Sequence, residues 1–185
     1  HEAFGFSQIE PVNVAMRRDS LFDMASVTKV VTTSTACAML VDEGKLDPDA
    51  PVTDYLQDHV GEGVEKISLR RLASHTSGFP EHPRLGERGQ GAEMFAAMLS
   101  ESPSWQCNSR YQYACRNAII LSTVVEQVSG QSFSDFCRER LFEPLNMVDT
   151  QFNRVEALDR AAASHSPTLG ASSNIDVRAA GRAIG

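Results

Sequence analysis

A serine and a lysine stand three residues apart at the head of an apolar stretch, LFDMASVTKVVTTSTACAML, at residues 21–40. At helical spacing, Ser26 and Lys29 lie one turn apart on the same side, so the amine can reach the hydroxyl. At a helix N-terminus, unpaired backbone N–H groups and the positive end of the helix dipole would stabilise an oxyanion forming on a bound carbonyl. This pattern predicts a serine nucleophile with its base in the same helical turn.

The helix that carries this pair is predicted to run from about Ser26 to Gly44, a residue suited to a helix C-terminus. Val27, Val30 and small neighbours make it apolar on nearly every side, which predicts a buried helix. An ammonium in an apolar site has a lowered pKa, so part of Lys29 would be free amine, able to take the serine proton. The competing interpretation is that Ser26 only caps the helix and Lys29 is a solvated first-turn residue.

Composition limits the possible functions. The chain has 185 residues, a formal net charge of −7 and a sequence pI near 5.2, so it fits one domain and offers no basic face for nucleic acid. No apolar run approaches the roughly 18 residues of a membrane span. The chain starts at His1 without a visible signal peptide, which leaves the compartment open.

Four cysteines are too few for a disulfide scaffold in a chain of this length. Cys37 and Cys137 lie among apolar residues and are interpreted as core side chains. Cys107 and Cys115 could pair, although nothing else in the sequence suggests a cystine-rich design.

Metal and cofactor sites are not expected. His75, Glu81 and His82 are close in sequence, but Gly78 and Pro80 interrupt any helix that would align them. No other cluster of cysteine and histidine has zinc spacing, and the predicted chemistry needs no cofactor.

Helices dominate the expected secondary structure, and no linker or internal repeat divides the chain. Residues 81–91 are polar and glycine-rich and are expected to form a loop. Expected elements are a strand within 1–10 closed by Pro11, and helices at 68–75, 92–101, 117–130 and 132–144, with Ser68 and Ser132 or Ser134 as N-caps and Gly130 and Pro144 as stops.

Five segments in order carry a family resemblance: LFDMASVTKVV, VDEGKLDPDAPVTDYL, ISLRRLASHTSGFP, YACRNAIILSTVVEQVSG and LFEPLNMVDTQF. From about Phe4 to Phe152, the chain resembles the serine β-lactamase/penicillin-binding-protein superfamily. The closest branch is the class C-like one, which also holds D-alanyl-D-alanine peptidases and carboxylesterases. The resemblance implies an α+β fold, represented mostly by its helical part with an incomplete antiparallel sheet. Residues 1–185 would form a single, incomplete domain of this kind.

The resemblance also implies roles for individual residues. Ser26 matches the acylated nucleophile, Lys29 the lysine of the same motif, and Tyr113 the tyrosine of the second motif, Y-x-N, which shares the general-base role. Cys115 stands where the family has asparagine, at a position that contacts the substrate and the lysine, and a thiol is a weaker hydrogen-bonding group. Asn117, two residues on, is expected to face elsewhere on a helix.

The family's third motif, [KH]-[TSA]-G, has no counterpart after residue 150. The triplet Ser172–Ser173–Asn174 fits the second motif by pattern only, and HTSG at 75–78 is interpreted as structural. Three explanations stay open: a piece of a normal enzyme, a short homologue completed by a second chain, and a non-catalytic relic. Without the rest of the sheet, the core helix is expected to expose a large apolar patch.

The sequence therefore predicts a serine hydrolase that forms an acyl-enzyme on an amide, β-lactam or ester carbonyl of a small-molecule or peptide substrate. The alternative is a non-catalytic binding or scaffold protein that keeps the fold. The resemblance favours a periplasmic or secreted location. Specificity would come from loops at 81–91 and 101–112, where Arg84 and Arg88 are interpreted as solvated.

Overall fold

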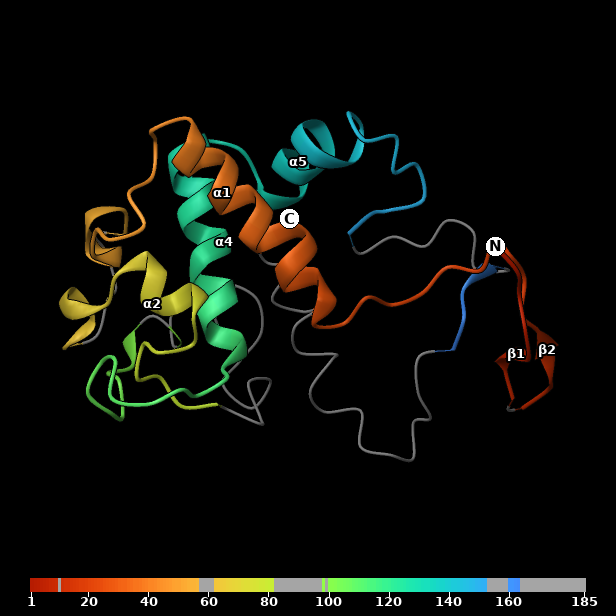
Figure 1. The fold of residues 1–185 in the computed structure, drawn as a ribbon, viewed down its shortest axis with the longest axis horizontal. Helices are drawn as coiled ribbons and strands as arrows, with labels where there is room; N and C mark the ends of the chain where they lie inside the picture. The colour runs from red at the N-terminus through yellow and green to blue at the C-terminus, as the bar shows by residue number, and fades with distance from the viewer. Residues whose placement is uncertain (10, 57–61, 82–97, 99, 153–159, 164–185) are drawn as a thin grey trace.

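A body of packed helices and a small antiparallel hairpin make up the fold (Figure 1). The computed structural model describes residues 1–9, 11–56, 62–81, 98, 100–152 and 160–163. In chain order the elements are β1 Phe6–Gln8, β2 Val14–Ala15, η1 Lys29–Ser34, α1 Thr35–Asp42, η2 Val52–Asp54, η3 Val64–Lys66, α2 Leu69–Ala73, α4 Cys115–Ser129, α5 Phe133–Cys137 and η5 Arg138–Phe142. Helices accompanied by a two-stranded antiparallel sheet confirm the predicted α+β class.

The helix after Ser26 begins with a π-helical stretch, η1, and continues as α1. Hydroxyl groups bond back along it: Thr32 Oγ1 donates to the Thr28 carbonyl at 2.7 Å, and Thr35 Oγ1 donates to the Val30 carbonyl at 3.1 Å. Such bonds compete with the regular backbone pattern and favour local distortion of a helix. The predicted end at Gly44 is confirmed, because that glycine follows the last helical turn with a φ of +68°.

In the part of the chain that the structure describes, this helix is buried on one flank and exposed on another. Ala36 and Leu40 are fully buried, whereas Val27 and Val30 are 54% and 68% exposed. The prediction that the helix is buried on nearly all sides is therefore wrong: α4 packs against it, but Val27 and Val30 remain exposed. The exposed apolar flank expected from an incomplete sheet is what the structure has instead.

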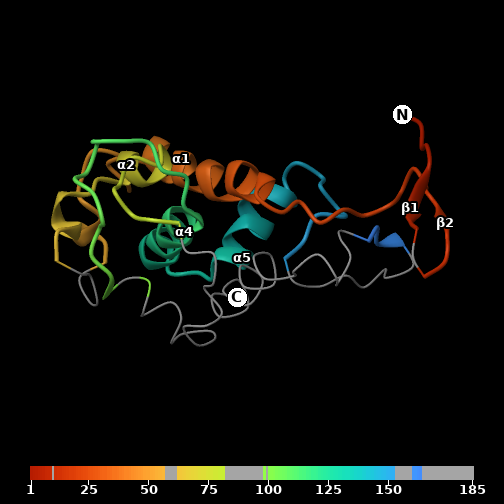
Figure 2. The same cartoon turned by 90° about the horizontal axis from the view of Figure 1, so that it is seen from below.

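Helix α4 is the centre of the helical body, and it contacts α1, α2 and α5 (Figures 1 and 2). Its residues Ile120, Leu121, Val124 and Val125 are buried and belong to the main apolar core. Burying one such side chain stabilises a fold by about 1.5–3 kcal/mol. The helix ends at Gly130, whose φ of +71° is readily adopted by glycine.

A tight turn follows the short helix α2. Ser68 takes the N-cap position with extended backbone, as predicted, but its side chain makes no capping bond. After α2, the backbone reverses at His75 (φ +55°) and Gly78 (φ +91°). The Gly78 carbonyl then accepts the N–H groups of Ser104 and Trp105 at 3.0 and 3.2 Å, which fastens residues 104–105 beside this turn.

Helix α5 begins at a side-chain cap: Ser132 Oγ accepts the Asp135 N–H at 3.1 Å, as the sequence predicts. Cys137 is fully buried, and Cys37 packs against the same core while partly exposed, so their predicted core role is confirmed. All four cysteines are free, so Cys107 and Cys115 form no disulfide.

The hairpin lies at one end of the molecule, away from α2 and α4 (Figures 1 and 2). Among the described residues of the strand predicted at 1–10, Phe6–Gln8 forms the strand, and its partner Val14–Ala15 was not predicted. A later segment joins them: Ala163 donates its N–H to the Ser7 carbonyl at 2.9 Å, and Ala161 forms a parallel bridge with Leu21. No pattern in the last 25 residues predicts this pairing.

Several predictions lie outside the described residues: most of the helix at 92–101, nearly all of the loop at 81–91 with Arg84 and Arg88, and the triplet at 172–174. Met98, within that predicted helix, is described and fully buried. In the part of the chain that the structure describes, no helix is both long and apolar enough to cross a bilayer.

Candidate active site

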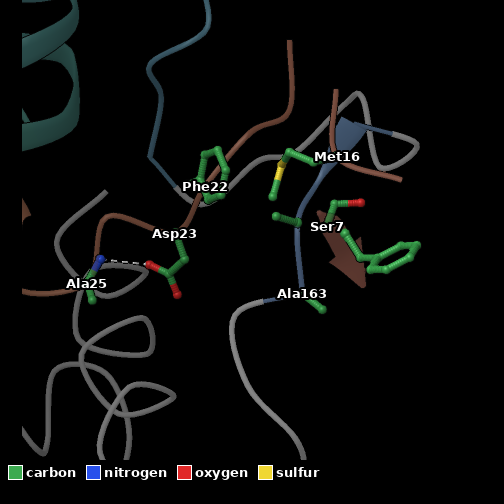
Figure 3. Close-up of a pocket in the computed structure, with 8 residues that line it drawn as sticks. Ser7, Met16, Phe22, Asp23, Ala25 and Ala163 are labelled. Carbon is green, nitrogen blue, oxygen red and sulfur yellow. Dashed lines mark hydrogen bonds between the residues drawn. The ribbon is translucent and has the colours of Figure 1, made fainter. Parts of the chain in front are cut away.

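Ser26 stands in a tight turn at the entrance to the first helix, and it is exposed to solvent. The preceding Ala25 has a φ of +43°, a region that non-glycine residues rarely adopt. Asp23 supports the turn, because its Oδ1 accepts the Ala25 N–H at 2.9 Å (Figure 3). The Met24 carbonyl accepts the Val27 N–H at 2.9 Å, which closes the turn around the serine.

Lys29 lies one turn along the helix and reaches back to the serine. Its Nζ donates a hydrogen bond to Ser26 Oγ at 3.0 Å, the proximity that the three-residue spacing predicts. Lys29 is half-buried near the start of the helix.

Tyr113 also contacts Ser26, although it lies 87 residues later in the sequence. Its hydroxyl donates to Ser26 Oγ at 2.8 Å, and the Lys29 Nζ lies 5.3 Å from the centroid of its ring. Two polar side chains therefore converge on one serine oxygen. The structure brings together the three residues that the resemblance had singled out.

The charge state of Lys29 differs from the prediction. Burial is the largest single influence and lowers its pKa. The hydrogen bond with Tyr113 and the attraction of negative charge on Cys115 and Tyr113 together outweigh burial, so the pKa of Lys29 is raised. The predicted lowering is wrong because the site is only half-buried and polar partners surround the amine. Lys29 is an ammonium at neutral pH.

Cys115 opens α4 beside this cluster. Its backbone N–H donates to Glu81 Oε2 at 3.0 Å, and its sulfur, as an acceptor for the Lys29 ammonium, contributes to the raised pKa of Lys29. The thiol therefore stands near the ammonium, as expected for the residue at the family's asparagine position. Asn117 is fully buried and its amide contacts Ser77 and His75, so the prediction that it faces elsewhere is confirmed.

One neighbour of the cluster was not predicted as functional. The ring of His75 lies 4.7 Å, centroid to centroid, from the ring of Tyr113. Its sequence signal is the HTSG segment at 75–78, for which the resemblance predicts a structural role only. Sequence spacing offered no means of placing position 75 against position 113.

A hollow of about 350 Å³ adjoins the turn that precedes the serine (Figure 3). Apolar side chains and one carboxylate line most of it, and the hairpin, the 22–25 segment and the 162–163 segment each contribute walls. Its lining residues include Phe6, Met16, Phe22, Asp23, Ala25 and Ala163. The hollow touches the turn but none of Ser26, Lys29 and Tyr113, so the cluster is defined by its hydrogen bonds.

Among the described residues, no three or more histidine, cysteine or acidic side chains are grouped so that they could hold a metal ion. Two of the residues considered as metal ligands accept backbone hydrogen bonds instead. His75 accepts the Ala114 N–H, and Glu81 accepts the Cys115 N–H. His82 lies outside the described residues.

A family model described as "Beta-lactamase" matches residues 1–183. The chain belongs to the beta-lactamase family. Among curated relatives, "Penicillin-binding protein 4" from Amycolatopsis lactamdurans is 34% identical over 165 residues, which are 85% of this chain and 43% of the relative. A "Putative D-alanyl-D-alanine carboxypeptidase" from Escherichia coli strain K12 is 27% identical over 148 residues, covering 72% of this chain and 34% of the relative.

Solved structures show the same fold. A class C beta-lactamase in complex with cefoxitin gives a TM-score of 0.78 at 20% identity, covering 89% of this chain and 46% of that one. A penicillin-binding protein homologue from Caulobacter crescentus gives a TM-score of 0.72 at 26% identity, covering 89% and 45%. The predicted serine β-lactamase/penicillin-binding-protein fold is confirmed, and this beta-lactamase family chain spans less than half the length of these relatives.

Proposed function

We propose that this chain carries the nucleophile of a serine hydrolase, which acts by forming an acyl-enzyme at Ser26. The observation that carries the proposal is the convergence of two donors on one hydroxyl oxygen, Lys29 at 3.0 Å and Tyr113 at 2.8 Å. A nucleophile and its proton acceptor must lie within about 2.6–3.2 Å of each other, and both distances fall in that range.

Tyr113 is the proposed proton acceptor. The reactive form in this proposal is the Tyr113 phenolate, which accepts from the Ser26 hydroxyl across the same 2.8 Å. As the Ser26 oxygen attacks the carbonyl carbon, its O–H bond breaks, the proton passes to the phenolate oxygen to give the neutral hydroxyl, and the new C–O bond forms. When the tetrahedral intermediate collapses, Tyr113 returns that proton to the leaving group. A water molecule then hydrolyses the ester, with the same tyrosine first accepting and then returning a proton.

Lys29 acts in this scheme as a cation. Because its pKa is raised, its ammonium stays charged beside the Tyr113 phenolate and beside the Ser26 oxygen as that oxygen loses its proton. A positive charge about 3 Å from a developing anion stabilises that anion, and more strongly where water is excluded. This role replaces the free-amine base expected from the sequence.

The oxyanion itself needs backbone donors. The proposal assigns the Ser26 N–H as one of them, and the family's second donor belongs to a strand whose motif has no counterpart after residue 150. Losing one oxyanion donor removes roughly 3–4 kcal/mol of transition-state stabilisation. The 185-residue chain alone is therefore expected to acylate slowly.

The substrate class follows from the relatives. The names of two relatives point to D-alanyl-D-alanine peptides and penicillins, and one similar structure holds cefoxitin. All three ligand types offer a carbonyl that a serine oxygen can attack, and we assign this chain an amide, β-lactam or ester carbonyl.

Covalent labelling tests the proposal. The chain is incubated with a fluorescent penicillin and, separately, with a fluorophosphonate probe, and labelled protein is resolved on a denaturing gel. Ser26→Ala should abolish labelling by both probes, whereas Ser109→Ala, at an exposed serine in another turn, should leave it intact. Equal labelling of the wild type and Ser26→Ala would refute the proposal, and no labelling of any form would favour the non-catalytic scaffold.

A further inference from the structure

His75 holds three consecutive residues of the segment that delivers Tyr113. Its backbone carbonyl accepts the Gln112 N–H at 2.8 Å. Its ring lies against the Tyr113 ring at 4.7 Å between centroids, with planes inclined by 39°. Its Nδ1 accepts the Ala114 N–H at 3.3 Å. Backbone and side chain of one histidine thus fix the residue before the tyrosine, the tyrosine itself and the residue after it.

A buried network determines which nitrogen of this ring carries the proton. Ser77 Oγ donates to Asn117 Oδ1 at 2.9 Å, so the asparagine amide nitrogen is directed at His75 Nδ1, 3.0 Å away. Ser77 and Asn117 are both essentially fully buried, so water does not offer an alternative partner. Both groups facing Nδ1, this amide and the Ala114 N–H, are donors. Nδ1 must therefore present its lone pair, with the proton on Nε2.

The backbone at His75 is held in an uncommon conformation. Its φ of +55° lies in the left-handed region, which is unfavourable for a residue with a Cβ atom. Such strain persists where the surroundings over-determine the conformation, and it gathers at functional sites. At His75 this conformation accompanies a carbonyl bonded to Gln112 and a ring against Tyr113.

We propose that His75 is the positioning residue for Tyr113, and that it works as a neutral imidazole whose Nδ1 accepts from the backbone next to the tyrosine. This inference rests on the proposed acyl-enzyme function. His75 does not touch the serine. It acts by keeping the Tyr113 hydroxyl 2.8 Å from Ser26 Oγ, a distance that a small shift of residues 112–114 would lengthen.

Protonation of the ring would undo this arrangement. A proton on Nδ1 would face two donors and displace both. Burial, and then the positive charge of Lys29, lower the pKa of His75. The ionisable side chains that face the ring are Lys29, Tyr111 and Tyr113. Acylation is therefore expected to fall only below the ordinary histidine pKa of 6.5.

Two variants separate the contributions. His75→Gly removes the ring and the acceptor but suits the positive φ, so its backbone is not strained. His75→Asn keeps a side-chain acceptor near the Nδ1 position on a residue that tolerates this conformation, and it does not titrate. Each is made in the wild type and in Tyr113→Phe, and urea unfolding confirms that each variant is folded before its rate is measured.

The measured quantity is the rate of labelling by the fluorophosphonate. His75→Gly should slow labelling at least tenfold, and His75→Asn should recover part of that loss and lack the acid fall. In the Tyr113→Phe background, His75→Gly should add less than a twofold further loss, since the hydroxyl that it positions is already gone. A loss below twofold in the wild type, or an equal loss in both backgrounds, would overturn the inference.

Nitrogen-15 NMR of the histidine ring gives an answer that does not depend on activity. The Nε2–H form is expected at pH 7, and the Ala114 amide signal should move as the ring titrates. A ring with its proton on Nδ1, or charged at pH 7, would overturn the inference. Labelling that needs Ser26 but ignores His75 would refute this inference alone, whereas labelling independent of Ser26 would refute the proposed function.

Discussion

Replacing Gly78 by alanine probes the turn that holds residues 75–79 beside residues 104–105. A Cβ atom added at Gly78 would lie 2.2 Å from the Trp105 carbonyl oxygen, far inside van der Waals contact, and the glycine also has a φ of +91°. The obstacle is backbone and cannot rotate away. Gly44 provides a matched control, because its φ is +68° and an added Cβ would meet nothing within 4 Å.

The expected losses follow from these two environments. Both substitutions impose a left-handed backbone on alanine, which costs about 1–2 kcal/mol. Gly78→Ala must also push Trp105 away, and this breaks the bonds from the Ser104 and Trp105 N–H groups to the Gly78 carbonyl. At about 0.5–1.5 kcal/mol each, these bonds add roughly 1–3 kcal/mol. The unfolding free energy should therefore fall by about 2–5 kcal/mol for Gly78→Ala and about 1–2 kcal/mol for Gly44→Ala.

Urea unfolding followed by circular dichroism measures the difference. With a slope of about 2 kcal/mol per molar, the midpoint of Gly78→Ala should lie roughly 0.5–1.5 M below that of Gly44→Ala. Labelling at Ser26 should slow in Gly78→Ala, because the same turn carries His75. Two midpoints that agree within the error of the fit would show that the close approach at Trp105 is not there.

Four further outcomes are expected. Tyr113→Phe should slow acylation about 10²–10⁴-fold, the usual effect of losing a general acid–base group, and an unchanged rate of fluorophosphonate labelling would contradict its assigned role. Lys29→Arg should retain more labelling than Lys29→Met, because the proposed role needs a positive charge. An equal loss in both variants would instead support Lys29 acting as a free-amine base. Because the folded-state pKa of Lys29 is raised, its contribution to stability should be fully present below pH 10.5 and decline as the pH rises through that higher folded value, so wild type and Lys29→Met should converge in alkaline urea titrations. Ser132→Ala should reduce the unfolding free energy by about 1 kcal/mol through loss of the α5 cap, and an unchanged urea midpoint would show that the bond to the Asp135 N–H adds nothing.

Local patterns were the part of the fold that the sequence predicted well. Gly44 and Gly130 ended their helices as expected, and Ser132 capped the next one, because these effects depend on a few neighbouring residues. The proximity of Ser26 and Lys29 is of the same kind, since it needs only one helical turn.

Features that depend on distant residues were out of reach without the resemblance. The contact of Tyr113 with Ser26 joins positions 87 residues apart, and no periodicity encodes it. The predicted lowering of the Lys29 pKa was wrong for a related reason. The apolar neighbours in sequence predicted a site without water, but the side chains of Val27 and Val30 are exposed to solvent. The role of His75 depends on the same long-range meeting.

Ser26 is exposed to water, and the exposed side chains of Val27 and Val30 lie on the helix that follows it. Water in contact with a developing oxyanion weakens the pull of the nearby ammonium, because the attraction between charges falls as the surrounding dielectric rises. A polypeptide segment that packed over Val27 and Val30 would bury their apolar surface and at the same time exclude water from Ser26. The free energy of unfolding and the rate of acylation would then rise together. At this helix, stability and activity would increase with the same contact, whereas in many enzymes one is gained at the expense of the other.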